Sequence, residues 1–339
     1  MVMYMVEHKI GIVGGSGFVG SAIARYLVKA FKVKIIDIEP SPFKSLQASE
    51  FEFEKCDIRE YYEVEKSLMD VDLVIHTAII QLPLINEEKR LGYEVNVIGT
   101  QNLCKVVDGN PQIKGLILTS SWHVFGESGL SGTITEEFGF RPDKVQERAR
   151  LYALCKIAQE TVVRIHDELS EKIFGVVRIG TVLGEEMPRK TAANLFISQG
   201  LNGEAITPYK DSMHRPMLYI DVGDVQKGFA SYAKKMLNGR VGKEGNSLHH
   251  VVNLCWPNPV TIIELAQMTR DLIIEETDGN VKPQIKIVDT GHPNIFAAVD
   301  RKLMRVDINK AREFLGMKNL TSPQESLRRI IRERFAQTR

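Results

Sequence analysis

The stretch KIGIVGGSGFVGSAIARYL, residues 9–27, decides which fold to expect. A short apolar run leads into closely spaced glycines and then into a segment of helical character, which is the order strand, turn, helix. Gly14, Gly17 and Gly20 fit the pattern GxxGxxG, and Gly15, Gly17 and Gly20 fit GxGxxG. A side chain at these positions would block the tight turn, the approach of a pyrophosphate to the helix N-terminus, or the contact between helix and strand. The stretch favours a dinucleotide-binding turn, with a plain tight turn as the alternative.

The next apolar run, KVKIIDI at residues 32–38, ends in an acid. Asp37 lies about 20 residues beyond the glycines, where a carboxylate accepts hydrogen bonds from the adenosine ribose. A carboxylate there would repel a 2′-phosphate, and no arginine follows it closely, so the sequence favours NAD over NADP. Asp37 as an ordinary strand-end turn residue stays possible, but that interpretation does not explain the glycines.

Short β-branched runs alternate with helix-like segments from residue 9 to about residue 184. Besides the two strands above, we expect strands at residues 51–58, 71–78, 115–121 and 173–180, and helices that include residues 19–31 and 93–107. Several of these strands are apolar almost throughout, as parallel strands buried on both faces are. The alternation predicts an α/β fold with a Rossmann-type, doubly wound parallel sheet.

The regular alternation stops after residue 184. We expect an NAD-binding Rossmann domain at residues 1–184 and a smaller, mixed α/β substrate-binding region at residues 185–339, with part of residues 214–256 returning to pack on the first domain. A strand is predicted within residues 247–256, and helices within residues 259–274 and 308–317. His249 and His250 are adjacent, so on a strand they would face opposite sides and could not chelate one metal ion. No metal site is expected.

Composition argues against several classes of partner. The 339 residues carry a formal net charge of +1, which gives no long-range field for nucleic acid or for an acidic membrane surface. No transmembrane helix is expected, because no run of about 18 apolar residues occurs. The apolar stretch at residues 1–10 is too short for a secretory signal. The four cysteines form no CxxC pair, and we expect a reducing, cytoplasmic location.

Tyr152 and Lys156 lie four residues apart in RLYALCK, residues 150–156, a segment of helical character. This spacing places both side chains on one face of a helix. A tyrosine is a poor base at neutral pH, but a nearby ammonium and the positive nicotinamide of an oxidised cofactor favour its phenolate and lower its pKa. The pair is a candidate proton-transfer site; an aromatic residue and a lysine on a surface helix are the alternative.

With these motifs the sequence resembles the extended short-chain dehydrogenase/reductase family, the NAD-dependent epimerases and dehydratases, and is UDP-glucose 4-epimerase-like. The resemblance covers nearly the whole chain, and the order of the motifs is more specific than any one of them. They are VGGSGFVG (13–20), CDIRE (56–60), HTA (76–78), NVIGTQNL (96–103), TSSWHVFG (119–126), YALCK (152–156), HRPMLYIDVGDV (214–225) and INKAREFLG (308–316).

The resemblance implies a role for each matching residue. Ser121 and Tyr152 would hydrogen-bond the reacting hydroxyl, Tyr152 would move its proton, and Lys156 would hold the nicotinamide ribose and tune the tyrosine. Asn96 would brace the ends of the sheet, and Ser120 is expected to point away from the substrate. The residues that would hold NAD are Gly14, Gly17, Phe18, Val19, Gly20, Asp37, Asp57, Ile58, Thr77, Ala78, Tyr152 and Lys156.

The substrate side matches the family less well. Arg215 corresponds to an arginine that commonly holds a sugar-nucleotide diphosphate, whereas the usual second arginine is missing from DTGHPNIF at residues 289–296. Thr181 stands where the family usually has an asparagine, and residues 143–150 are inserted as an extra helical turn or a flap over the site. The candidate substrate contacts are Ser121, Thr181, Asn194, Tyr209 and Arg215.

Trp122 and His123 stand where sugar-nucleotide dehydratases commonly carry an acidic pair, so the resemblance argues against the usual 4,6-dehydratase route. Two interpretations of His123 stay open. Its imidazole could be catalytic as an acid or base, since histidine titrates near neutral pH. Alternatively, it could hydrogen-bond a backbone carbonyl at the strand end while Trp122 packs against the substrate loop.

The activity implied by the resemblance is NAD-dependent epimerisation of a nucleotide sugar: hydride passes to NAD, the ketone turns over in the pocket, and hydride returns to the other face. A dehydrogenase of another secondary alcohol that releases NADH would use the same residues, and the weakened diphosphate clamp favours it. A non-catalytic NAD-binding regulator is a third possibility, against which the retention of Ser121, Tyr152 and Lys156 argues. The resemblance also implies a homodimer through the helices that carry Asn96 and Tyr152.

Overall fold

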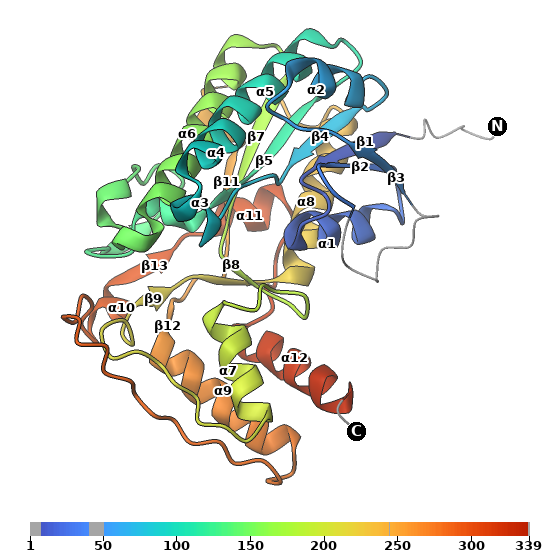
Figure 1. Cartoon of the computed structure of the whole chain (residues 1–339). Helices are drawn as coiled ribbons and strands as arrows, with labels where there is room; N and C mark the ends of the chain where they lie inside the picture. Colours follow the sequence, from blue (N-terminus) through green and yellow to red (C-terminus); the bar gives the residue numbers. More distant parts are fainter. Residues whose placement is uncertain (1–7, 41–50, 244, 338–339) are drawn as a thin grey trace.

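The computed structural model describes residues 8–40, 51–243 and 245–337. Figure 1 shows an upper half built on one sheet and a lower half made mostly of helices. Residues 1–7, which make up most of the stretch for which we expect no secretory signal, lie outside the described residues. None of the described helices is long and apolar enough to cross a membrane.

Seven parallel strands form the central sheet, in the order β11-β7-β5-β4-β1-β2-β3. They are β1 (Lys9–Val13), β2 (Lys32–Asp37), β3 (Glu52–Lys55), β4 (Leu73–His76), β5 (Gly115–Ser121), β7 (Ile173–Ile179) and β11 (Val251–Leu254). The predicted doubly wound α/β fold is confirmed, and the first six of these strands lie where the apolar runs placed them. The strand order reverses between β1 and β4, which is where such sheets bind their ligands.

Helices cover both faces of the sheet (Figure 1). One face carries α2 (Tyr61–Ser67), α5 (Thr100–Gly109) and α6 (Glu147–Leu169), and the other carries α1 (Phe18–Leu27), α8 (Val222–Leu237) and α11 (Asn309–Phe314). Along β5, Ile117 packs with the α1 and α8 side, whereas Leu116 and Leu118 pack with the α2, α5 and α6 side. Because alternate strand residues point to opposite faces, a sheet covered on both sides requires apolar runs of this kind.

The edge strand β11 comes from the C-terminal half of the chain and pairs with β7. Helix α8, from the same half, packs against α1. The domain boundary at residue 184 stays a prediction. Strand β11 begins later than predicted, because Ser247–His250 form a 3-10 turn, η4. The expectation that His249 and His250 lie on opposite sides of a strand is therefore wrong.

The lower half packs α7 (Ala192–Leu201), α9 (Ile262–Glu276) and α12 (Pro323–Gln337) together. Short two-stranded ladders pair β8 (Thr181–Leu183) with β10 (Tyr219–Asp221), β9 (Pro216–Met217) with β12 (Val260–Thr261), and β6 (Gly132–Ile134) with β13 (Met304–Val306). The remaining short elements are α3 (Leu84–Glu87), α4 (Lys89–Tyr93), the π-helical segment η1 (Glu94–Gly99), the 3-10 turns η2 (Trp122–Phe125) and η3 (Pro142–Lys144), and α10 (Asp300–Leu303).

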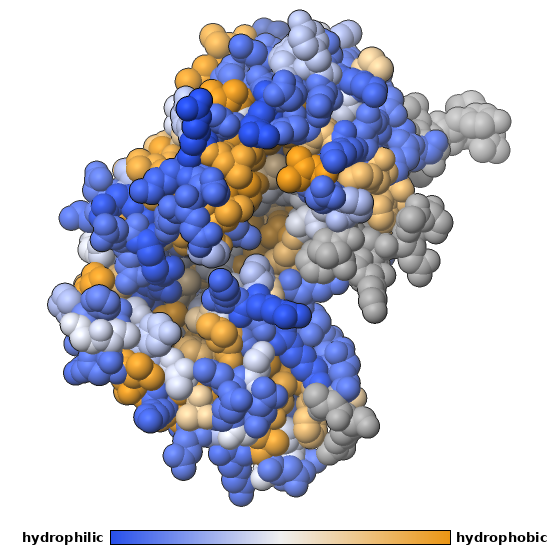
Figure 2. Space-filling view, viewed as in Figure 1, coloured by the Kyte–Doolittle hydropathy of each residue, from blue (hydrophilic) through white to orange (hydrophobic). Residues whose placement is uncertain are grey.

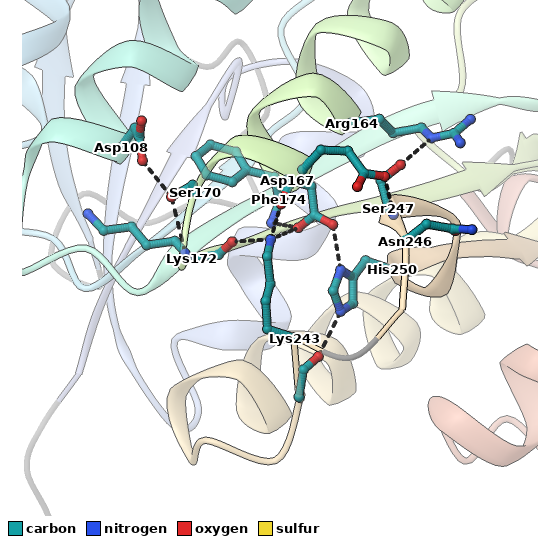
Figure 3. Close-up of polar contacts among 12 residues, drawn as sticks. Asp108, Arg164, Asp167, Ser170, Lys172, Phe174, Lys243, Asn246, Ser247 and His250 are labelled. Atoms are coloured by element: carbon teal, nitrogen blue, oxygen red, sulfur yellow. Dashed lines mark hydrogen bonds and ion pairs between the residues drawn. The ribbon is translucent and has the colours of Figure 1, made fainter.

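A buried ionic cluster holds the segment that leads into β11 against the end of α6 (Figure 3). The Asp167 carboxylate lies 2.7 Å from His250 Nδ1 and accepts hydrogen bonds from Lys243 Nζ at 2.9 Å and from the Phe174 N–H at 2.8 Å. The other ring nitrogen of His250 lies 2.9 Å from Gly242 O. Burial alone would raise the pKa of the Asp167 carboxyl, but these hydrogen bonds outweigh burial and hold the pKa below its ordinary value.

Asp167→Asn is expected to lower the free energy of unfolding by about 3 kcal/mol at neutral pH, because it removes the counter-charge of Lys243 and a buried acceptor beside His250. Since the folded-state pKa is lowered, this contribution is complete above the ordinary carboxyl pKa of about 4 and is lost as the pH falls toward the lowered value. Urea unfolding of wild type and variant from neutral to acid pH measures it, with Glu171→Gln, an exposed neighbour, as the control. A difference that stays constant on acidification would contradict this role of Asp167.

Candidate active site

A cleft of about 1260 Å³ runs between the two halves of the molecule, at the carboxyl ends of the parallel strands. Figure 2 shows hydrophobic side chains gathered along the hollow on this face. All but one of the residues expected to bind cofactor or substrate line this cleft. They are Gly14, Gly17, Phe18, Val19, Gly20, Asp37, Asp57, Ile58, Thr77, Ala78, Ser121, His123, Tyr152, Lys156, Thr181, Tyr209 and Arg215.

The glycine turn between β1 and α1 forms one wall of the cleft. Gly14 has a φ of 78°, and a Cβ there would lie 2.3 Å from Ala78 N, while a Cβ on Gly20 would lie 2.4 Å from Gly14 O. Among the residues that the structure describes, a Cβ on Gly17 would meet only Gly14 O, at 3.4 Å. The protein's own packing thus requires Gly14 and Gly20, whereas the space beyond Gly17 is open. Helix α1 has no acid in its first turn and no side-chain cap, so its N-terminus fits a pyrophosphate.

Two carboxylates lie farther along the same wall. Asp37, at the end of β2, accepts hydrogen bonds from the Ser16 N–H at 3.0 Å and the Ile38 N–H at 2.8 Å, and burial raises its pKa. Asp57 forms an ion pair with Arg59 at 2.5 Å, which holds the pKa of Asp57 below its ordinary value. Thr77 Oγ1 lies 2.9 Å from Gly14 O, so this side chain braces the glycine turn.

Ser121, Tyr152 and Lys156 all line the cleft. Ser121 ends β5, and the other two residues lie one turn apart on α6. Burial raises the pKa of Tyr152, and a hydrogen bond with Ser121 opposes this effect. Burial lowers the pKa of Lys156 to about 7, and its Nζ donates to Thr119 O at 2.8 Å. Lys156 Nζ is thus held by the backbone of β5, and the expectation that Lys156 and the nicotinamide together lower the pKa of Tyr152 stays a prediction.

Two polar residues expected to be structural are confirmed as such. Asn96 Oδ1 accepts from the Ile80 N–H at 2.7 Å, and its Nδ2 donates to Ile80 O at 3.0 Å. Ser120 Oγ donates to Glu160 Oε2 at 2.9 Å. Glu160 in turn forms an ion pair with Arg178 at 2.5 Å, and both side chains are almost completely buried. A charged pair behind the end of β5 therefore supports the strand that carries Ser121.

His123 lies on the turn η2 directly after Ser121. Its Nδ1 is 3.1 Å from Ser121 Oγ, and its Nε2 is 3.5 Å from Glu127 Oε1. Among the described residues its polar partners are thus two side chains, so the interpretation that gave it a backbone carbonyl partner is wrong. Trp122 is buried, and its indole N–H donates to Thr181 Oγ1 at 3.1 Å.

Of the residues expected to contact the substrate, Arg215 and Tyr209 line the cleft and Asn194 does not. Arg215 donates through Nη1 to Gln146 Oε1 at 2.6 Å, and its buried Nε has no hydrogen-bond partner among the described residues. Tyr209 is exposed at the cleft. Asn194, in contrast, does not line the cleft: its Nδ2 donates to Met187 O at 2.7 Å and its Oδ1 accepts from Arg334 Nη1 at 2.9 Å. The expectation that Asn194 contacts the substrate is therefore wrong, because this side chain fastens α7 to α12.

The inserted residues 143–150 do not form a flap. They run from η3 into the first turn of α6, and from this segment Gln146 and Arg148 line the cleft. Neither residue was expected there. Glu127, whose Oε1 lies 3.5 Å from His123 Nε2, was not expected near the site either. These three belong to no motif that the sequence offers, so only the folded chain identifies them.

Comparison with known proteins agrees with this geometry. The model of the NAD-dependent epimerase/dehydratase family matches residues 10–246, well over half of the chain. The chain belongs to the NAD-dependent epimerase/dehydratase family. It is therefore an enzyme with NAD as its cofactor, and the open space beyond Gly17 and the carboxylate of Asp37 suit that molecule.

Individual members of the epimerase/dehydratase family are similar over nearly the whole chain. UDP-glucuronic acid decarboxylase 1 of Danio rerio is 26% identical over 332 residues, which cover 95% of this chain and 72% of that protein. The structure of UDP-glucose 4-epimerase from Thermotoga maritima with UDP-glucose has a TM-score of 0.77 at 21% identity, with coverage of 97% and 99%. That of UDP-glucuronic acid 4-epimerase from Bacillus cereus with NAD has a TM-score of 0.73 at 20% identity, with coverage of 96% and 99%. These two structures share the fold.

Substitutions in the glycine turn should separate cofactor binding from folding. Gly17→Ala is expected to weaken NAD binding by at least about tenfold, or about 1.4 kcal/mol, with an unchanged melting temperature, because the new methyl group enters the space left for the pyrophosphate. Gly20→Ala is expected to lower the melting temperature as well, since its Cβ would lie 2.4 Å from Gly14 O. Calorimetric titration with NAD and thermal unfolding measure both quantities. Wild-type NAD affinity in Gly17→Ala would contradict the placement.

Proposed function

We propose that the protein is an epimerase that inverts a secondary alcohol of a nucleotide sugar through a transient keto intermediate. The observation that carries the proposal is that Ser121, Tyr152 and Lys156 line one cleft with the glycine turn and Arg215, and that the Ser121 hydroxyl is hydrogen-bonded to the Tyr152 phenol. When bound, NAD accepts a hydride from the sugar carbon and returns it. No net redox change results, so the cofactor stays bound through turnover.

The chain's own residues supply the other parts of this chemistry. Tyr152 takes the proton of the reacting hydroxyl, Ser121 holds that hydroxyl, and Lys156 holds the nicotinamide ribose. Gly14, Gly17, Phe18, Val19 and Gly20 cradle the pyrophosphate, Asp37 binds the adenosine ribose, and Asp57 with Ile58 lies beside the adenine, while Thr77 and Ala78 border the middle of the cofactor. Thr181, Tyr209 and Arg215 are the substrate contacts. The buried Nε of Arg215 has no hydrogen-bond partner in the described part of the chain, which supports its assignment to the diphosphate.

A second candidate is decarboxylation of a UDP-linked uronic acid, which the likeness to UDP-glucuronic acid decarboxylase 1 favours. Both reactions begin with oxidation of a sugar hydroxyl by the same residues. They diverge at the ketone: a ketone β to a carboxylate can lose CO2, whereas one without that carboxylate cannot and is either reduced again or released. A dehydrogenase that releases NADH stays the third candidate.

Incubation of the purified protein with NAD and a panel of UDP-, dTDP- and GDP-sugars, including UDP-glucose and UDP-glucuronic acid, tests the proposal. Sugar identity, CO2 release and the absorbance of reduced nicotinamide are followed together. Interconversion of two epimers without CO2 or accumulated NADH supports the epimerase. Release of CO2 from the uronic acid identifies a decarboxylase, and stoichiometric NADH with a keto product identifies a dehydrogenase; either overturns it.

We also propose that two copies pair through α6 and the neighbouring η1. Both elements pack together and expose apolar side chains: Ile98 on η1, and Leu154 and Ile165 on α6, are between 39% and 51% exposed. Sedimentation at micromolar concentration, expected to give twice the chain mass of 38.2 kDa, tests the dimer.

A further inference from the structure

Two arginines from distant parts of the chain share one hydrogen-bond acceptor in the cleft. Arg215 Nη1 donates to Gln146 Oε1 at 2.6 Å, and Arg148 Nε donates to the same oxygen at 3.1 Å. All three residues line the cleft, Gln146 and Arg148 at the start of α6 and Arg215 directly before β9. Like charges repel each other, so the convergence of two guanidinium groups on one uncharged oxygen marks a point that attracts negative charge.

The charge of Arg215 is already compensated. The Glu127 side chain is completely buried, and its Oε1 lies 3.6 Å from Arg215 Nη1. Burial would raise the pKa of Glu127, but the contact with His123 and the charge of Arg215 lower it, so the carboxylate is ionised. Arg215 and Glu127 together therefore carry almost no net charge, and this pair by itself would attract an anion only weakly.

Arg148 supplies a positive charge that no carboxylate compensates. Within the described part of the chain this guanidinium forms no ion pair, and its Nε donates to the uncharged Gln146 amide. A guanidinium stays charged at every pH at which the protein is folded, and it carries several N–H donors in a rigid fork. The exposed side chain of Arg148 thus brings both a charge and spare donors to the cleft.

The Arg215 guanidinium also has a donor to spare. Its Nε is buried without a hydrogen-bond partner among the residues that the structure describes. A buried donor without a partner is destabilising, and a ligand that supplies an acceptor removes that cost. An anionic oxygen is the best acceptor for this purpose, because opposite charges strengthen the hydrogen bond, which the uncharged Gln146 amide cannot do.

The position of Arg148 on α6 indicates which part of a substrate it can reach. Arg148 lies four residues before Tyr152, so the two side chains share one face of the helix and are about 6 Å apart along its axis. In the proposed reaction Tyr152 takes the proton of the reacting hydroxyl. A group held by Arg148 therefore belongs to the sugar or to the phosphate attached to it. The oxyanions available there are this sugar-linked phosphate and a carboxylate on the sugar ring.

We propose that Arg148 and Arg215, with the Gln146 amide between them, form a two-arginine site that binds an oxyanion at the sugar end of the substrate. This inference rests on the proposed nucleotide-sugar substrate. Both guanidinium groups donate to the oxyanion, and Arg148 supplies the net charge. Gln146 spaces the two guanidinium groups, and its N–H is held by Glu127 Oε2 at 2.8 Å, so Gln146 and Glu127 are positioning residues.

Calorimetric titration of the NAD-loaded protein with UDP, UDP-glucose and UDP-glucuronic acid tests the two-arginine site. Arg148→Gln is expected to weaken binding by about 10-fold, because hydrogen bonds between charged groups are lost. Arg148→Lys keeps the charge without the fork of donors and is expected to weaken binding by about 3-fold. Arg150→Gln is the matched control, because Arg150 is exposed on the same helix and is not among the described residues that line the cleft.

The three ligands distinguish the two sources of the oxyanion. A loss of affinity shared by all three identifies the sugar-linked phosphate, and a loss confined to UDP-glucuronic acid identifies a carboxylate on the ring; either result supports the site. Affinities within twofold of wild type for every ligand in Arg148→Gln, or no binding to wild type, would overturn it. The titration needs no turnover, so the site is decided by affinity even if the sugar panel identifies a decarboxylase or a dehydrogenase.

The dependence on salt separates ligand binding from a merely structural role. Because Arg148→Gln removes a charge that attracts the ligand, the ratio of its Kd to that of wild type should fall toward one as NaCl rises from about 0.05 M to about 1 M. A variant that had lost only packing would keep a constant ratio. A ratio that does not change with salt therefore contradicts the role of Arg148 as a ligand-binding cation.

Gln146→Glu places a carboxylate at the point where the two guanidinium groups converge. The new side chain has nearly the shape of the old one, and the two arginines then face two carboxylates, so the melting temperature is expected not to fall. The same carboxylate competes with the oxyanion of the ligand, and binding of all ligands that occupy the site is expected to weaken by at least about 10-fold. Wild-type affinity in Gln146→Glu would show that the ligand does not use this point of the cleft and would overturn the proposal.

Discussion

Tyr152→Phe is expected to lower kcat for nucleotide-sugar turnover by about 1000-fold, because it removes the oxygen that takes the substrate proton. Phenylalanine keeps the ring that packs against His123 in an edge-to-face arrangement, so the melting temperature and the affinity for NAD should stay close to wild type. The loss should appear in the hydride-transfer step itself, measured as the rate of nicotinamide reduction in a single turnover.

Removal of the phenolic oxygen from an exposed tyrosine provides the control for this experiment. Tyr62 on α2 is 80% exposed, and Tyr62→Phe should leave kcat unchanged. Retention of more than about a tenth of wild-type kcat in Tyr152→Phe would show that another group takes the proton, since proton transfer by a placed side chain contributes about 100-fold or more.

The largest expected loss of stability follows from breaking the buried pair of Arg178 and Glu160. Glu160→Ala is expected to lower the free energy of unfolding by about 3–5 kcal/mol, because it leaves the Arg178 guanidinium buried without its counter-charge and Ser120 without its acceptor. The rings of Phe125 and Phe140 near the guanidinium, at 5.3 and 5.6 Å, can offset only part of this loss. Urea unfolding measures the effect.

A charge-free replacement of both partners distinguishes the lost charge from lost packing. Arg178→Met combined with Glu160→Leu removes both charges and keeps most of the volume, so it is expected to be more stable than Glu160→Ala alone. This variant also provides folded protein if Glu160→Ala does not accumulate. Equal or lower stability of the double variant would show that side-chain volume, and not charge pairing, holds α6 to β7.

The sequence predicted the parts of the fold that local patterns encode. Most of the strands between residues 9 and 180 are recognisable because they are apolar runs between polar segments, and burial on both faces requires such runs. The edge strand β3 is the exception, since its residues EFEK are mostly charged and exposed. The start of β11 was misplaced because an apolar run does not show where hydrogen bonding to β7 begins. His250 was assigned to that strand, although its buried pairing with Asp167 holds it on the preceding turn.

The same distinction between local patterns and tertiary contacts applies to the residues of the site. Gly14, Asp37 and Tyr152 belong to motifs, so their positions in the cleft could be inferred from spacing. Glu127 and Gln146 could not, because a turn at Gly126 and the contact with Arg215 bring them together. Asn194 was assigned to the substrate from its place along the chain, and the contact with Arg334 of α12 shows why position alone misled.

The pairing of β11 with β7 affects how the chain folds while it is being synthesised. Until residues 251–254 have left the ribosome, β7 is an open edge with unpaired backbone groups, and such edges recruit strands from other molecules. A fragment that stops near residue 184 would keep that edge permanently and is expected to aggregate. Closing the sheet over an interval of more than seventy residues is also slow, so the protein is most exposed to misassembly between the synthesis of β7 and that of β11.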